Sequence, residues 1–145
     1  MENRIASSRA LPTLIRLSNV LRLASFFETL QKHLQSVAPQ EHSNPRVALW
    51  TPPSGSYREF EDTYLARYLG LTLVQGSDLV VSDGYVCMRT TQGLQRVDVI
   101  YRRINDDFLD PEAFDESSML GVPGLLRAWK AGNVALANAP GAGVA

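Results

Sequence analysis

From residue 46 onward, short apolar runs alternate with amphipathic helical patterns, and this alternation limits the chain to few fold classes. Four runs indicate strands: "RVALW" at 46–50, "LTLVQ" at 71–75, "VDVIYRR" at 97–103 and "NVALANA" at 133–139. Strands that alternate with helices form a largely parallel sheet covered on both faces. We therefore predict an α/β domain over residues 46–145, with a Rossmann-like, mostly parallel sheet and flanking helices.

Two helices and one hairpin are predicted between these strands. Residues 56–70 place apolar side chains on one helical face and end at a glycine, which is a typical helix stop. Residues 121–132 indicate a short helix with Pro123 in its first turn, where proline is tolerated. The Asp83-Gly84 pair lies between two apolar runs and is a strong signal for a hairpin turn.

The region before residue 46 has a different pattern. Residues 11–37 repeat apolar side chains at spacings of three, four or six, which indicates one long helix or two short ones. Residues 38–45 are polar and bounded by proline, as linkers often are. We therefore predict a helical arm and linker over residues 1–45. The apolar face is wide, so an arm without partners would expose apolar surface and favour self-association.

Composition excludes several classes of function. The chain has 145 residues and a net charge of −1, which gives no electrostatic reason to bind nucleic acid or an anionic membrane. Cys87 is the only cysteine, so the sequence offers no disulfide framework and no cysteine metal site. No apolar segment resembles a signal peptide or is long enough to span a bilayer. We therefore expect a cytoplasmic location.

The ends of the predicted strands are the first candidates for a site. Ligands of open parallel sheets bind outside the carboxyl ends of the strands. The four strands are followed by polar or glycine-rich segments: "TPPSGSY", "QGSD", "RRINDD" and "NAPGAG". Parallel strands would bring these segments to one edge, where we predict a functional cleft. The alternative is that they are polar only because loops are polar in any protein.

The loop after the first strand supports two hypotheses. Ser56 and Glu59 have the S-x-x-E spacing of a capping box before an apolar helical pattern. The free amides of the same helix start could instead hold a carboxylate or a phosphate. A self-capped helix has fewer amides to offer, so we favour the cap for this pair. Ser54, Gly55 and Tyr57 remain candidates for ligand contact.

Two adjacent arginines, Arg102 and Arg103, end the third strand. Successive strand residues face opposite sides, so the two side chains cannot both point the same way. An arginine at a strand end can bind a carboxylate through two parallel hydrogen bonds and stays charged at any ordinary pH. The alternative is an internal ion pair with Asp98, Asp106 or Asp107.

Three aspartates follow these arginines, at Asp106, Asp107 and Asp110. Carboxylates so close together could contact a divalent ion, but the spacing matches no calcium loop. We favour a solvated loop that leads into a helix, because Asp110-Pro111-Glu112 is a good helix start. We therefore predict no metal site here.

Several segments in order resemble a known family, the circularly permuted ATP-grasp type 2 proteins. This family is related to glutathionylspermidine synthetase and, more remotely, to glutathione synthetase. The resemblance covers nearly the whole chain. The matching segments are "ENRIASSRALP", "TPPSGSYREFEDTYLARYLG", "LVQGSDLVVSDGYV", "GLQRVDVIYRRINDDFLDP" and "GVPGLLRAWKAGNVALANAPGAGV".

The resemblance implies ADP-forming carboxylate–amine ligation, with ATP and magnesium as cofactors of the full-length parent. The nucleotide and magnesium ligands are not found in this sequence, and the chain stops just after an apolar run, so we expect it to be a segment of a longer protein. The family's tyrosine–x–arginine motif falls on Tyr101 and Arg103, which implies that Arg103 contacts substrate. The corresponding helix start covers Ser54, Gly55, Ser56 and Tyr57.

The sequence thus predicts the substrate-binding domain of an ATP-grasp ligase, inactive alone. Arg103 is the first choice for binding a substrate carboxylate and Arg102 the second. The expected partners are the rest of the parent chain and a small peptide or amino-acid-like substrate. The alternative is a non-catalytic interaction or scaffolding module, whose apolar arm packs on a partner.

Overall fold

The centre of the fold is a parallel sheet. The structure, a computed structural model, describes residues 6–7, 9–18, 23–39 and 43–142. Four strands lie in the order β2-β1-β6-β7, and every neighbouring pair is parallel. This arrangement confirms the predicted parallel sheet. The strands are β2 (Thr72–Val74), β1 (Val47–Trp50), β6 (Val99–Arg102) and β7 (Ala135–Leu136).

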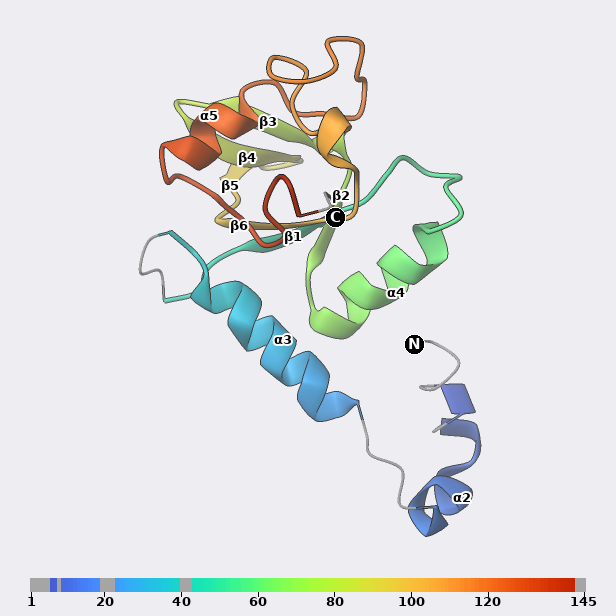
Figure 1. Cartoon of the computed structure of the whole chain (residues 1–145). Helices are drawn as coiled ribbons and strands as arrows, with labels where there is room; N and C mark the ends of the chain where they lie inside the picture. Colours follow the sequence, from blue (N-terminus) through green and yellow to red (C-terminus); the bar gives the residue numbers. More distant parts are fainter. Residues whose placement is uncertain (1–5, 8, 19–22, 40–42, 143–145) are drawn as a thin grey trace.

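Alternation along the strands divides the core between the two faces of this sheet. Ala48 and Trp50 belong to the larger apolar cluster, together with residues of a second sheet and of α5 (Leu125–Lys130). Val47 and Val99 belong to the other cluster, which includes side chains of α3 (Ala24–Ser36) and α4 (Glu59–Leu69). Figure 1 shows α3 and α4 on one side of the sheet, with α5 and the second sheet on the other. The flanking helices were therefore predicted correctly.

The second sheet is antiparallel, with the order β3-β4-β5. Its first two strands, β3 (Leu79–Ser82) and β4 (Tyr85–Thr90), form the predicted hairpin. Asp83 and Gly84 have φ of 51° and 80°, which a type I′ hairpin turn requires. The third strand, β5 (Gly93–Arg96), was not predicted, because it is short and carries few apolar side chains.

Over the predicted helical stretch 11–37, the described residues form two helices, α2 (Pro12–Leu17) and α3, rather than one long one. The second, α3, packs on the domain: Phe27 and Leu34 are buried, and the ring centroids of Phe27 and Tyr68 lie 4.3 Å apart. The first, α2, has no buried residue and lies apart from the sheets in Figure 1. The predicted boundary at residue 45 stays a prediction. Within the described residues no helix has the length and apolar character to cross a membrane.

Two 3-10 turns follow strands at the carboxyl edge of the parallel sheet. They are η1 (Gly76–Asp78) after β2 and η2 (Asp106–Phe108) after β6. A side chain at Gly76 would overlap the backbone carbonyl of Leu120, so only glycine fits where η1 meets the loop before α5. Close backbone contact of this kind holds the long loop 109–121 against the domain.

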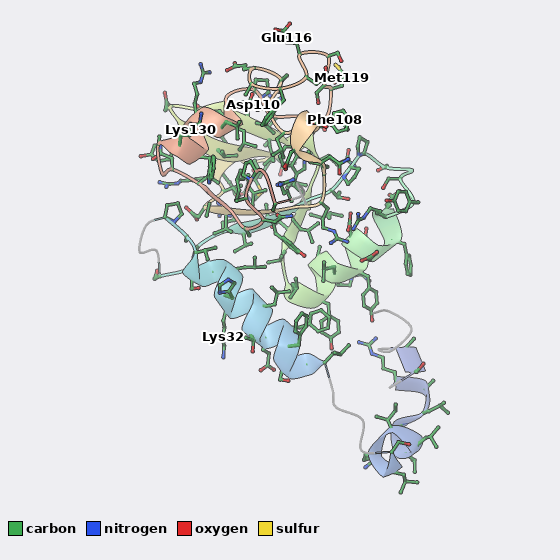
Figure 2. The ribbon with its side chains drawn as sticks, in the orientation of Figure 1. Lys32, Phe108, Asp110, Glu116, Met119 and Lys130 are labelled. Carbon is green, nitrogen blue, oxygen red and sulfur yellow. The ribbon has the colours of Figure 1, made fainter. Side chains whose placement is uncertain are left out.

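Asp110 has a different role from the one predicted. No helix begins at Asp110, and its side chain is buried rather than solvated. Its carboxylate accepts hydrogen bonds from the amides of Gly124 at 3.1 Å and Leu126 at 2.9 Å, at the start of α5. It also accepts a hydrogen bond from the backbone amide of Glu112 at 3.0 Å. Figure 2 labels Asp110 in the upper part of the molecule, near α5. The helix itself begins after Gly124, so Pro123 precedes it instead of lying in its first turn.

We expect Asp110→Asn to lower the free energy of unfolding by about 2–3 kcal/mol, because an amide replaces one acceptor oxygen by a donor that faces buried amides. Urea denaturation measures this change. Asp115→Asn is the matched control, since that carboxylate is exposed and, among the residues that the structure describes, accepts hydrogen bonds from Ser117 alone. Equal midpoints for the two variants would contradict the capping role of Asp110.

Candidate functional site

A pocket of about 620 Å³ lies where the ends of β6 and β7 meet the start of α4. Its volume is in the range of small-molecule sites, roughly 300–1,000 Å³. Its position follows the rule for open parallel sheets, with ligands outside the carboxyl ends of the strands. The lining residues are Arg58, Arg102, Arg103, Ile104, Asn105, Asp106, Asp107, Asn138 and Ala142.

Arg102 is a structural residue of this pocket. Its buried guanidinium donates to the backbone carbonyls of Asn138 (2.7 Å), Ile104 (2.7 Å) and Ala139 (3.0 Å) and forms an ion pair with Asp106. The Asn138 side chain also bonds the backbone of Arg102, as acceptor from N at 3.2 Å and as donor to O at 2.9 Å. These contacts fix the segment after β7 as one wall of the pocket and leave Arg102 little capacity for a ligand.

Arg103 points to the opposite side and is held by α4. Its Nε donates to Asp62 Oδ1 at 3.0 Å, and its Nη2 donates to Glu61 at 3.1 Å. Asp62 is fully buried, and its second oxygen accepts a hydrogen bond from the hydroxyl of Thr51 at 2.7 Å. The backbone amide of Arg103 donates to the carbonyl of Trp50 at 2.7 Å. Arg103 is therefore fixed in position by the carboxyl end of β1 and the first turn of α4.

The surroundings of Arg103 keep its guanidinium charged. Burial alone would lower its pKa, but the hydrogen bond and charge of Asp62, with smaller contributions from Tyr101 and Glu61, outweigh burial and raise the pKa. No hydrogen bond from Nη1 of Arg103 occurs within the described part of the chain, and 18% of the side chain is exposed. A bound carboxylate could accept hydrogen bonds from the remaining N–H groups.

Arg58 was missed by the sequence reasoning, which stopped one residue earlier, at Tyr57. Arg58 lies directly before α4, as its N-cap residue, and lines the pocket. Its Nε is buried and has no hydrogen-bond partner among the described residues. A buried N–H without an acceptor is rare and destabilising. The signal that could have found it is a basic side chain in the polar segment between a strand and a helix.

The residues predicted beside Arg58 do not line the pocket. The capping box of Ser56 and Glu59 was wrong: the Glu59 carboxylate accepts from the amide of Gly55 at 2.6 Å, and the Ser56 hydroxyl has no partner in the part of the chain that the structure describes. Ser54 accepts from the side chain of Gln75 at 3.2 Å. Gly55 is exposed with a φ of 90°.

Two further predicted contacts lie elsewhere. The side chain of Tyr57 is 93% exposed. Tyr101 borders a second, smaller pocket of about 120 Å³, which lies between α3 and α4 and which it shares with Arg103. Of the predicted contact residues, the larger pocket therefore brings together Arg102 and Arg103.

The aspartates at this edge do not fit a magnesium site. Asp106 is engaged by Arg102 and by the amide of Gly141 at 2.7 Å. Across the described ranges, no group of three or more histidine, cysteine or acidic side chains is arranged to hold a metal ion. We therefore assign no step to a metal on these residues.

We expect Asp62 and Arg103 to be energetically coupled. In a double-mutant cycle with alanine at both positions, the coupling free energy in urea denaturation should be about 1–3 kcal/mol, because the Asp62 carboxylate is buried. The pair of Glu112 and Arg127 is the matched control, since both side chains are well exposed at 47% and 78%. Equal coupling in the two cycles would contradict the positioning role of Asp62.

Comparisons with known proteins identify one family and several sequence relatives. The profile of the family described as circularly permuted ATP-grasp type 2 matches residues 1–145. An uncharacterised protein of Synechocystis sp. is 47% identical over 145 residues, which are 100% of this chain and 30% of that protein. An uncharacterised protein of Mycobacterium tuberculosis is 44% identical over 144 residues, which are 99% of this chain and 26% of the relative.

A second uncharacterised protein of Mycobacterium tuberculosis is 35% identical over 144 residues, 16% of its own length. The chain thus spans less than a third of each of these relatives. The family profile nevertheless covers the described domain and both of its sheets. The chain belongs to the circularly permuted ATP-grasp type 2 family.

Proposed function

We propose that the chain is the substrate-binding α/β domain of an ADP-forming carboxylate–amine ligase of the ATP-grasp type, in which Arg103 binds the substrate carboxylate. The observation that carries this proposal is the guanidinium of Arg103, held by the buried Asp62 at the edge of the pocket. The family membership supports the ligase class. The closer kinship with glutathionylspermidine synthetase is part of the same proposal.

The chemistry of the pocket suits recognition of a carboxylate. A planar guanidinium can offer two parallel N–H groups to the two oxygens of a carboxylate. Asp62 and Thr51 hold Arg103 from behind, so little side-chain freedom is lost when a ligand binds. The volume of about 620 Å³ accommodates a small peptide or an amino-acid-like substrate.

The reaction itself is assigned to the rest of the parent chain. Proteins of the ATP-grasp class generally use ATP and magnesium, and ATP would supply the phosphoryl group that activates the substrate carboxylate. Among the described residues no group of three or more histidine, cysteine or acidic side chains is arranged to hold a metal ion. In this proposal the domain therefore contributes binding and orientation. Its partners in this proposal are the remaining parts of the parent chain.

We expect the purified chain of 145 residues to release no ADP above background when it is incubated with ATP and magnesium. The reason is the lack of a metal-binding group among the described residues. A coupled assay for ADP measures this directly. Turnover that survives repurification and disappears on heat denaturation would contradict the proposed division of roles.

We expect Arg103→Ala to weaken binding of simple carboxylates by about tenfold or more, because a charge-assisted pair of hydrogen bonds is lost. The probes are acetate and N-acetylglycine, titrated into ¹⁵N-labelled protein and followed by amide chemical shifts. Arg127→Ala is the control, because that arginine lies on α5, is highly exposed and pairs with Glu112. Equal affinities of the two variants, or no binding to the unchanged chain, would refute the assignment.

The second candidate function is a non-catalytic interaction module. The observation in its favour is the apolar surface of α2 and of the preceding Leu11, where Leu11, Leu14 and Leu17 are 52%, 57% and 80% exposed. Surface of this kind suits another protein or a second copy of the chain. A module of this kind has no need of a carboxylate-binding arginine, so the titration of Arg103→Ala distinguishes the two functions.

A further inference from the structure

The charged side chains that line the large pocket are unequally paired. Arg102 and Asp106 neutralise each other. Arg103 also lines the pocket, and carboxylates of α4 outside the lining compensate its charge. Arg58 and Asp107 line the pocket too, and neither has an ion pair in the described part of the chain. The pocket therefore contains one uncompensated positive and one uncompensated negative side chain.

Arg58 supplies the positive charge, from the wall formed by the start of α4. Its side chain is half-buried, and its Nε has neither a protein partner nor contact with solvent. The terminal N–H groups of Arg58 also make no hydrogen bond in the described part of the chain, so an oxygen acceptor in the pocket could bind there and compensate the charge. Arg103 lines the same pocket, so a carboxylate can be shared between the two guanidinium groups.

Asp107 supplies the negative charge, from η2 after β6. Its backbone carbonyl accepts a hydrogen bond from the amide of Asp115 at 3.3 Å, which holds η2 to the following loop. Its carboxylate is exposed and makes no hydrogen bond in the described part of the chain. Two neutral amides, those of Asn105 and Asn138, are the other polar side chains in the lining.

We propose that the pocket binds a zwitterion, with the ligand carboxylate at Arg58 and Arg103 and the ligand ammonium group at Asp107. The ligand class is therefore an amino acid or a short peptide that carries both charges. A dicarboxylate fits less well, because its second carboxylate would be repelled by Asp106 and Asp107. Arg102 cannot compensate that charge, because it is already paired with Asp106. This inference rests on the proposed function and narrows the class of its substrate.

The test uses ω-amino acids of increasing length, from glycine to aminohexanoate, and the alkanoates with the same number of carbon atoms. Each is titrated into the ¹⁵N-labelled chain at low ionic strength. At the best length, we expect the amino acid to bind about two- to fivefold more tightly than its alkanoate, the range for an exposed ion pair. Added salt should reduce this advantage. If the amino acid binds no more tightly than its alkanoate at any length, the inference is overturned.

Variants at Asp107 identify the source of this preference. Asp107→Asn should make the amino acid and the alkanoate bind equally, and Asp107→Lys should make the dicarboxylate of the same length the tightest ligand. Glu116→Gln, which removes another exposed carboxylate, should preserve the preference. An amino-acid preference that survives Asp107→Lys would overturn the assignment of the ammonium contact.

Variants at Arg58 test the carboxylate end. Arg58→Gln should weaken the binding of amino acids and of alkanoates alike by about tenfold. Arg67→Gln, at an exposed position on α4, should leave the binding of both unchanged. If carboxylates bind in a manner that depends on Arg103, but amino acids bind no more tightly than alkanoates at any length, the proposed function stands and the zwitterion is refuted. If no carboxylate binds at all, both are refuted.

Discussion

The buried carboxylate of Asp62 organises the carboxyl edge of the parallel sheet. A fully buried carboxylate is stable only when its oxygens have partners, and here they are the Thr51 hydroxyl and the Arg103 guanidinium. Thr51 follows β1, Arg103 follows β6 and Asp62 lies on α4, so one side chain joins three elements. The position of the pocket wall depends on this junction, because Arg58 directly precedes the same helix.

The two adjacent arginines illustrate how one strand end can serve both structure and binding. Strand alternation turns Arg102 toward the segment after β7 and Arg103 toward α4. Arg102 is buried among backbone carbonyls, which it ties to β6. Arg103 keeps unused N–H groups at the pocket because its partners are carboxylates behind it. Replacing either by lysine would lose the planar geometry on which these contacts depend.

Local patterns in the sequence were enough to predict the parallel strands, the hairpin at Asp83-Gly84 and the arginines at the pocket. What could not be predicted depends on contacts between distant parts of the chain. Asp62 and Arg103 are 41 positions apart, and Asp110 caps a helix that begins 15 positions later, at Leu125. The predicted cap of Ser56 and Glu59 failed because α4 begins only at Glu59, with Arg58 as its N-cap residue, and the Glu59 carboxylate accepts from the amide of Gly55.

The guanidinium Nε–H resonances of the arginines, recorded in ¹⁵N NMR spectra during an acetate titration, would show which side chains contact a carboxylate. The contacts of Arg102 are internal, whereas Arg58 and Arg103 have N–H groups without partners in the described structure. We expect the signals of Arg58 and Arg103 to move with acetate and the signal of Arg102 to stay in place. Movement of Arg102 alone, or of none of the three, would contradict a carboxylate site at this edge of the sheet.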